Sequence, residues 1–154
     1  MNSRRFLIFR FGCFLVLMLG FAYAETGRVI KVIDGDTFVF EDEQRVRILG
    51  VDAPETRGED EPFSQEATAF IKVLLLNQTV TMEPDGISPD KDRYGRLLRY
   101  VYVDGQDVSR KLIEAGLGTV LREYRIDKME EYLQAEAEAK RKKIGLWADR
   151  KSVV

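Results

Sequence analysis

Short segments of alternating, β-branched residues recur along this sequence and limit the folds open to it. Each segment ends within a few residues, often at an aspartate-glycine turn such as Asp34-Gly35 or Asp104-Gly105, which favours a tight connection between strands. The pattern predicts five strands, at residues 27–33, 37–40, 45–49, 79–83 and 97–103. Strands this few cannot form a sandwich, yet they must bury an apolar face and protect their edges. We therefore expect a small closed barrel.

Three helical patterns complete the predicted architecture. Ser64 opens the first, which carries apolar residues at helical spacing. Asp107 is the expected N-cap of the second helix. Asp127 with Glu130 resembles a capping box that starts the third, which ends near Gly145. The expected class is therefore α+β, a five-stranded OB-fold β-barrel with about three α-helices, one of them inserted between the third and fourth strands.

Residues 1–24 have the features of a secretory signal peptide. Three arginines precede an apolar run at residues 11–21, and Ala22-Tyr23-Ala24 forms an A-x-A cleavage signature. The alternative is an uncleaved membrane anchor, but the run is shorter than the roughly 20 residues that a spanning helix needs. We expect cleavage after Ala24, a mature domain at residues 25–154, and a secreted or periplasmic protein that contacts a membrane only if the signal is retained.

The sequence contains no histidine, and its one cysteine, Cys13, lies in the predicted signal. These absences exclude a Ser-His-Asp triad, a Cys-His pair and histidine-based zinc sites. Carboxylates, arginine, lysine and tyrosine are left to carry any chemistry. Oxygen ligands indicate a hard cation such as Ca²⁺ or Mg²⁺.

The net charge counts mildly against a protein that binds nucleic acid tightly. It is −2 for the whole chain and −5 once residues 1–24, with three arginines and no acidic residue, are removed. Nucleic-acid-binding domains are usually basic. A local cationic patch is still compatible with an enzyme that must release its product.

Three acidic residues form the densest polar cluster. Asp36 begins the second predicted strand, and Asp52 and Glu55 follow the third. If neighbouring antiparallel strands bring Asp36 and Asp52 together, their carboxylates repel unless a cation or an arginine lies between them. The alternative is ordinary turn chemistry, because aspartate is common in turns and Pro54 requires a turn as well.

Two arginines lie near these acidic residues. Arg47 is on the third predicted strand, on the face opposite Val46 and Ile48, and Arg96 begins the fifth. Guanidinium groups bind phosphate oxygens bidentately, and a hard cation, a free carboxylate and two arginines together suit phosphodiester hydrolysis. The alternatives are a surface salt bridge for Arg47 and a solvated strand end for Arg96.

The order of the motifs resembles the staphylococcal nuclease (thermonuclease) family. The resemblance runs from about residue 27 to residue 148, and its matching segments are residues 32–37 (VIDGDT), 47–56 (RILGVDAPET), 92–96 (DRYGR) and 144–147 (IGLW). It implies the barrel with three helices and an exported Ca²⁺-dependent nuclease that cleaves DNA and RNA to leave 3′-phosphate ends. In that family, the residues matching Arg47 and Arg96 hold the phosphate and stabilise the transition state.

The resemblance also implies roles for the acidic residues. Asp36 and Asp52 would bind Ca²⁺ through their side chains, and the backbone carbonyl of Ala53 would be the third protein ligand. The type member has threonine at the position of Ala53, a change that a carbonyl ligand tolerates. Glu55 would act on the attacking water, as a general base or as an orienting group.

The nucleotide-binding side matches the family less closely. Arg93 and Tyr94 stand where the family has a basic residue and a tyrosine that contact phosphate, and Tyr124 aligns with one tyrosine of the pocket wall. Arg122 replaces the other wall tyrosine. Because arginine also stacks on bases, this replacement is compatible with binding, and the base preference and the affinity stay open. Packing alone is the alternative role for Tyr94 and Tyr124.

Two functions from different classes follow. The first is the enzyme, a monomer whose partners are its DNA and RNA substrates and which has no stable protein partner. The second is a catalytically inactive OB-fold module that only binds nucleic acid or protein, as some domains of the family do. Such domains usually lose the acidic residues or the arginines, whereas all five are present here: Asp36, Arg47, Asp52, Glu55 and Arg96.

Overall fold

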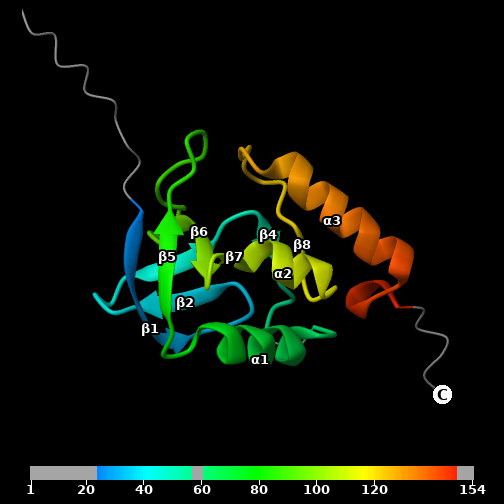
Figure 1. Cartoon of the computed structure of the whole chain (residues 1–154), viewed down its shortest axis with the longest axis horizontal. Coiled ribbons are helices and arrows are strands. Elements are labelled where there is room, and N and C mark those ends of the chain that lie inside the picture. Colours follow the sequence, from blue (N-terminus) through cyan, green and yellow to red (C-terminus); the bar gives the residue numbers. More distant parts are fainter. Residues whose placement is uncertain (1–23, 57–60, 149–154) are drawn as a thin grey trace, which may run out of the picture.

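A computed structural model describes residues 24–56 and 61–148 of the chain (Figure 1). The predicted signal peptide lies outside these residues except for Ala24, so its cleavage and the export of the protein stay predictions. In the described ranges, no helix combines the length and the apolar character needed to cross a bilayer.

Five strands close into a barrel. They are β1 (Glu25–Val32), β2 (Thr37–Phe40), β3 (Arg45–Ile48), β5 (Thr79–Glu83) and β6 (Leu97–Val103). Antiparallel pairing joins β1 to β2 and β5, β2 to β3, and β5 to β6, and a parallel pair between β3 and β6 completes the ring. The five predicted strands and the OB-type barrel are therefore confirmed.

Short pairings outside the barrel bring distant segments to its rim. The parallel pair sets Arg47 opposite Leu98, two residues after Arg96. Next to it, β4 (Val51–Asp52) pairs with β8 (Thr119–Val120). The loop that follows β3, the start of β6 and the segment after β8 thus meet at one edge of the barrel. A further short strand, β7 (Gln106–Asp107), pairs with the end of β6.

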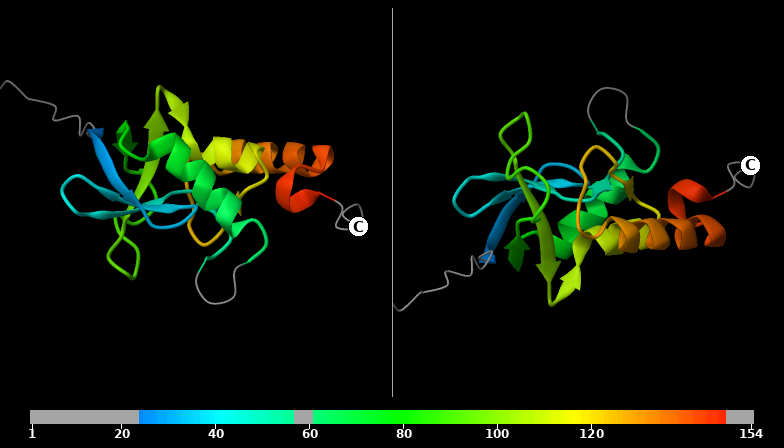
Figure 2. Two further views of the ribbon diagram at one scale, coloured as in Figure 1. Left: turned by 90° about the horizontal axis from the view of Figure 1, so that it is seen from below. Right: turned by 90° about the horizontal axis from the view of Figure 1, so that it is seen from above.

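The helices cover the barrel from two sides (Figures 1 and 2). They are α1 (Ser64–Leu75), α2 (Val108–Glu114) and α3 (Met129–Lys142), followed by the short 3-10 helix η1 (Gly145–Trp147). Helix α1 packs against β1, whereas α2 lies between the barrel and α3. The three predicted helices are confirmed.

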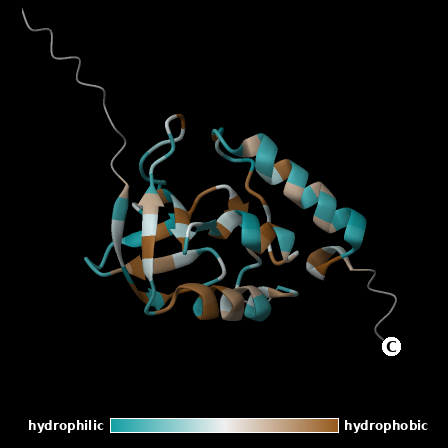
Figure 3. Ribbon diagram, viewed as in Figure 1, coloured by the Kyte–Doolittle hydropathy of each residue, from teal (hydrophilic) through white to brown (hydrophobic). Residues whose placement is uncertain are grey.

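One continuous apolar core joins the barrel to the helices. Helix α1 contributes buried Ala67, Ile71 and Leu75, and α3, which is mainly hydrophilic along its length (Figure 3), contributes buried Tyr132. Gly50, between β3 and β4, has a φ of 85°, and a Cβ there would collide with the Tyr132 ring. Glycine is required at this point because it alone tolerates both the backbone angle and the close approach.

The predicted capping box of the last helix is wrong. Helix α3 begins at Met129, its N-cap position is Lys128, and no side chain caps it. The backbone N–H of Asp127 donates instead to Oδ1 of Asp85 (2.9 Å), a residue of the β5–β6 loop. A tertiary contact therefore sets the start of α3, which a local sequence pattern cannot predict.

The predicted cap of α2 is confirmed, and its removal has a measurable cost. Asp107 accepts from Arg110 N (3.0 Å) with one oxygen, and from Lys128 Nζ (2.7 Å) and the hydroxyl of buried Tyr132 (2.8 Å) with the other. Asp107→Ala should lower the free energy of unfolding by roughly 2–4 kcal/mol, because a helix loses its cap and a buried hydroxyl loses its acceptor. Urea unfolding checks this. The matched control Asp127→Ala removes an exposed carboxylate and should change stability by less than about 0.5 kcal/mol.

Candidate active site

Asp36 is positioned by the turn between β1 and β2. Its backbone N–H donates to Asp34 Oδ1 (3.2 Å), and the turn packs so closely on the next loop that a Cβ on Gly35 would lie 2.6 Å from Ala53 Cβ. The buried Asp36 carboxylate accepts from Thr37 Oγ1 (2.9 Å) and from Ala53 N (3.0 Å). Two neighbouring turns therefore hold this side chain in one orientation.

Arg47 lies inside the barrel rim and not on its surface. Its side chain is 7 % exposed, and Nη1 donates to the carbonyls of Ile48 (3.0 Å) and Val51 (2.7 Å). Nη2 lies 3.1 Å from Asp36 Oδ2 and donates to Asp52 Oδ1 (2.9 Å). The alternative of a surface salt bridge is wrong, because this guanidinium is a fixed bridge between the two aspartates.

The surroundings of Asp36 oppose its ionisation. Burial raises the pKa of this carboxyl from 3.8 to about 6, Arg47 opposes the rise, and the nearby Asp34 adds to it. A further positive charge beside Asp36 would stabilise its ionised form. Arg47 alone does not offset the effect of burial on Asp36, so a bound cation would further favour the ionised carboxylate.

The two aspartates are compatible with a hard metal ion. Both approach Nη2 of Arg47, and Asp52 is half exposed, so one face of the pair is open to solvent. Within residues 24–56 and 61–148, no three acidic, cysteine or histidine side chains cluster closely enough to hold a metal ion on their own. A metal here would need carbonyl and water oxygens in addition, as Ca²⁺ sites commonly have. The residues present fit such an ion.

Arg96 is held in place by a residue that the sequence analysis missed. Its Nε donates to Asp92 Oδ2 (2.6 Å), and its Nη1 donates to Thr37 Oγ1 (3.2 Å), so it is not a solvated strand end. The Asp92 side chain is 4 % exposed and also accepts from the backbone N–H groups of Tyr94 and Arg96. Burial alone would raise the pKa of Asp92, but these hydrogen bonds outweigh it and lower that pKa.

A hollow of about 220 Å³ gathers most of the predicted site at the barrel edge. The predicted residues that line it are Arg47, Asp52, Glu55, Arg93, Tyr94, Arg96 and Tyr124. Four further residues line it that the sequence did not single out, namely Asp92, Leu98, Leu121 and Glu123. Asp36 and Ala53 lie behind this wall, joined to it through Arg47 and Asp52.

Tyr94 stands out from the rim of the hollow. Tyr94 is among the most exposed large hydrophobic residues of the described ranges, with 69 % of its surface accessible to solvent. The guanidinium carbons of Arg93 and Arg96 lie 5.0 and 5.4 Å from its ring centroid. Packing alone does not explain an exposed ring between two arginines. Tyr124 is partly buried in the wall, and burial raises its pKa.

Arg122 is not brought into the hollow. Its Nη1 donates to Val120 O (2.9 Å) and its Nη2 to Glu136 Oε2 (2.8 Å), so its guanidinium faces α3. Glu136 is 3 % exposed and also accepts from Lys140 Nζ (2.6 Å). Burial would raise the pKa of Glu136, but these hydrogen bonds lower it. The role of Arg122 in base binding stays a prediction.

Comparison with known protein families identifies the family of this chain. The family described as "Staphylococcal nuclease homologue" matches residues 45–149 of the chain. The chain belongs to the staphylococcal nuclease family. The resemblance seen in the sequence is thus confirmed, and the matched range includes Arg47, Asp52, Glu55 and Arg96.

Individual members of the staphylococcal nuclease family support the assignment. The chain is 38 % identical over 136 residues to the thermonuclease of Staphylococcus hyicus, covering 83 % of this chain and 79 % of that protein. It is 36 % identical over 127 residues to an uncharacterized endonuclease of Escherichia coli, covering 80 % and 77 %. The thermonuclease of Staphylococcus intermedius is 36 % identical over 130 residues, covering 80 % and 76 %. These relatives and the family assign nuclease activity to the chain.

Proposed function

We propose that the chain is an exported, calcium-dependent endonuclease that hydrolyses the phosphodiester bonds of DNA and RNA and leaves 3′-phosphate ends. The observation that carries this proposal is the hollow in which Arg47, Arg96, Asp52 and Glu55 meet. The named thermonuclease and endonuclease relatives support the reaction. The A-x-A sequence that ends at Ala24 supports export.

Calcium would be held by Asp36, Asp52 and the carbonyl of Ala53. Burial keeps the Asp36 carboxylate poorly solvated, and Asp52 opens toward solvent beside it. When bound, the ion would neutralise negative charge on the phosphate and make the attacking water easier to deprotonate. Carboxylate and carbonyl oxygens are the ligands that Ca²⁺ prefers.

The two arginines would bind the scissile phosphate from fixed positions. Arg47 is held by two backbone carbonyls, and Arg96 by Asp92 and Thr37. Donors fixed before the substrate arrives need no reorganisation as charge develops in the transition state, which is why they are effective. The exposed Glu55 carboxylate lines the same hollow, from which it can accept a proton from water or orient it.

A direct test uses single-stranded DNA and RNA with Ca²⁺, with Mg²⁺ and with a chelator. We expect cleavage with Ca²⁺ and its loss on chelation. The products should carry a 5′-hydroxyl that a kinase labels directly and a 3′-phosphate that a phosphatase removes, which mass spectrometry measures. Cleavage that ignores the chelator would contradict the metal dependence. A protein that cleaves neither substrate under any condition would contradict the enzymatic function. The mass of the exported product tests the cut after Ala24.

Calcium should also stabilise the folded protein, independently of catalysis. At a Ca²⁺ concentration of about 100 times Kd, the free energy of unfolding should rise by about 2.7 kcal/mol. Asp52→Asn should abolish most of this increase, because it removes a charged ligand. The control Asp42→Asn, in the exposed turn between β2 and β3, should retain it. Thermal unfolding with and without Ca²⁺ measures both, and an equal calcium response in the two variants would contradict the assigned ligands.

A further inference from the structure

Three adjoining hollows run along one side of the molecule from the active site. The active-site hollow shares Glu55, Tyr94 and Arg96 with a second hollow of about 220 Å³, which Arg45 also lines. The second hollow shares Ile33 with a third, of about 470 Å³, on the surface of α1 beside Lys72. Because they share lining residues, the three hollows adjoin in a row that begins at the active site, and we call this row the depression.

The charges of the second and third hollows favour a polyanion. Arg45, on β3, and Lys72, in the last turn of α1, are both exposed. Neither makes an ion pair with any residue in the two described ranges. Lys72 is the one charged residue among those that line the third hollow. In the second hollow Arg45 and Arg96 outnumber Glu55.

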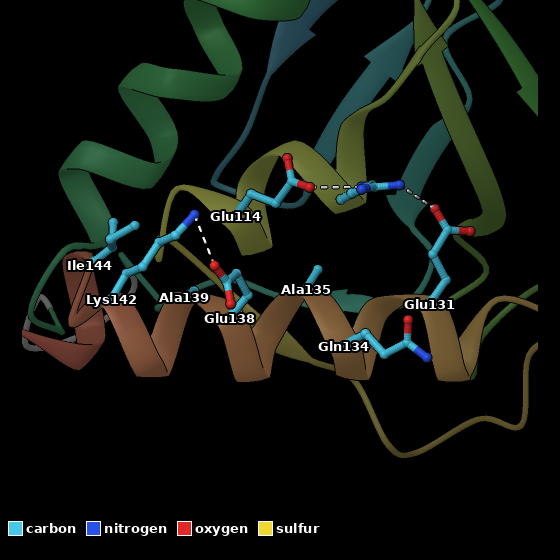
Figure 4. A pocket seen from close by; sticks show the side chains of 9 residues that line it. Glu114, Glu131, Gln134, Ala135, Glu138, Ala139, Lys142 and Ile144 are labelled. Carbon is cyan, nitrogen blue, oxygen red and sulfur yellow. Dashed lines mark hydrogen bonds and ion pairs between the residues drawn. The ribbon is translucent and has the colours of Figure 1, made fainter.

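Another large hollow is different in this respect. It lies between α2 and α3 and has a volume of about 460 Å³ (Figure 4). Its cations are already neutralised, since Arg110 pairs with Glu114 and Glu131 and Lys142 pairs with Glu138. The cations of this hollow are therefore less available to a polyanion than Arg45 and Lys72 are.

An aromatic ring marks the boundary between the first two hollows. Tyr94 lines both and is 69 % exposed. A ring in this position can stack on a base while cations on either side contact the backbone, which is how proteins bind single strands without sequence preference.

We propose that a single-stranded part of the substrate extends from the active site over Arg45 to Lys72, and that each of these two residues contacts a backbone phosphate. This inference rests on the proposed nuclease function and adds to it a preference for long single strands over short ones. A chain with a net charge of −5 after signal removal repels polyanions at long range. The exposed cations Arg45 and Lys72 compensate locally for this repulsion where the strand lies.

The test compares substrates of different length. Cleavage of a single-stranded oligonucleotide of about 12 nucleotides, within the range that one OB fold covers, is measured beside cleavage of a dinucleotide with one phosphodiester bond. Lys72→Ala, Arg45→Ala and the double variant are compared at several salt concentrations. Each single variant should raise KM for the long strand and reduce the slope of log KM against log salt by about 0.7, the value for one lost single-strand phosphate contact. The Lys72→Ala variant should cleave the dinucleotide as the unchanged protein does.

Two further measurements make the outcome decisive. Lys142→Ala removes the same charge from α3, outside the depression, and should leave the slope unchanged. Fluorescence anisotropy of the labelled long strand, measured in chelator, reports binding without cleavage. Slope losses seen there support the path even if the protein cleaves nothing, which would overturn only the nuclease function. Normal cleavage with unchanged slopes, or equal losses in Lys142→Ala, would overturn the path.

Discussion

Replacing Glu55 by glutamine is expected to lower kcat by roughly 10²-fold or more, while the melting temperature stays close to that of the unchanged protein. Glu55 is exposed and lines both the active-site hollow and its neighbour. Its loop is held through backbone atoms, because Glu55 N donates to Glu61 Oε2 (3.0 Å) and Glu61 N donates to Glu55 O (3.1 Å). Glutamine preserves both contacts and the side-chain shape, so only the ability to accept a proton and the negative charge are lost.

The matched control is Glu123→Gln, which removes the same charge from the wall of the same hollow. Glu123 faces the path of a polyanion, so its neutralisation should lower KM, the opposite direction from a loss of catalysis. Steady-state kinetics with Ca²⁺ separates the two variants. If both changed kcat equally, Glu55 would act only through the net charge of the hollow, and its assigned role on the attacking water would be wrong.

Local sequence patterns were sufficient to predict the elements of the barrel. The strands at 37–40, 79–83 and 97–103 have their predicted bounds, because each is a short alternating or β-branched run enclosed by turn residues. The start of α1 at Ser64 and the Asp107 cap of α2 were predictable for the same reason. What these patterns cannot contain is pairing between distant segments. The parallel contact of β3 with β6, which closes the barrel, depends on residues about 50 positions apart.

The sequence indicated which residues meet at the site better than it indicated the surroundings of each side chain. Alternation along β3 placed Arg47 on the face opposite the core, yet the loop after β3 folds back over it and buries it. Arg122 was expected in the pocket wall, but a buried carboxylate on α3, Glu136, binds it on another side. Asp92 was missed as a support for Arg96, although the spacing of four residues between an acid and an arginine was a visible signal.

Arg47→Met is expected to have the largest combined effect on activity and stability. The loss of a fixed hydrogen-bond donor to the phosphate should reduce kcat by about 10²–10³-fold. The free energy of unfolding should fall by about 3–5 kcal/mol, because Asp36 is left as a buried carboxylate without its ion-pair partner. Burial already raises the pKa of Asp36 to about 6 with Arg47 in place, so water cannot replace the lost ion pair at this side chain. Urea unfolding and steady-state kinetics measure the two effects.

A double variant separates the orphaned charge from the lost arginine. In Asp36→Asn, Arg47→Met, the buried negative charge is absent, so the second substitution should cost less stability than it does in the unchanged chain, a coupling of the size that contacting charged residues show. Activity should not recover, because the arginine that binds the phosphate is still missing and a proposed calcium ligand has been removed as well. Arg45→Met on the same strand is the stability control, since its exposed side chain should change the free energy of unfolding by less than about 0.5 kcal/mol. Additive losses from Asp36→Asn and Arg47→Met would mean that the 3.1 Å pair does not hold the site together.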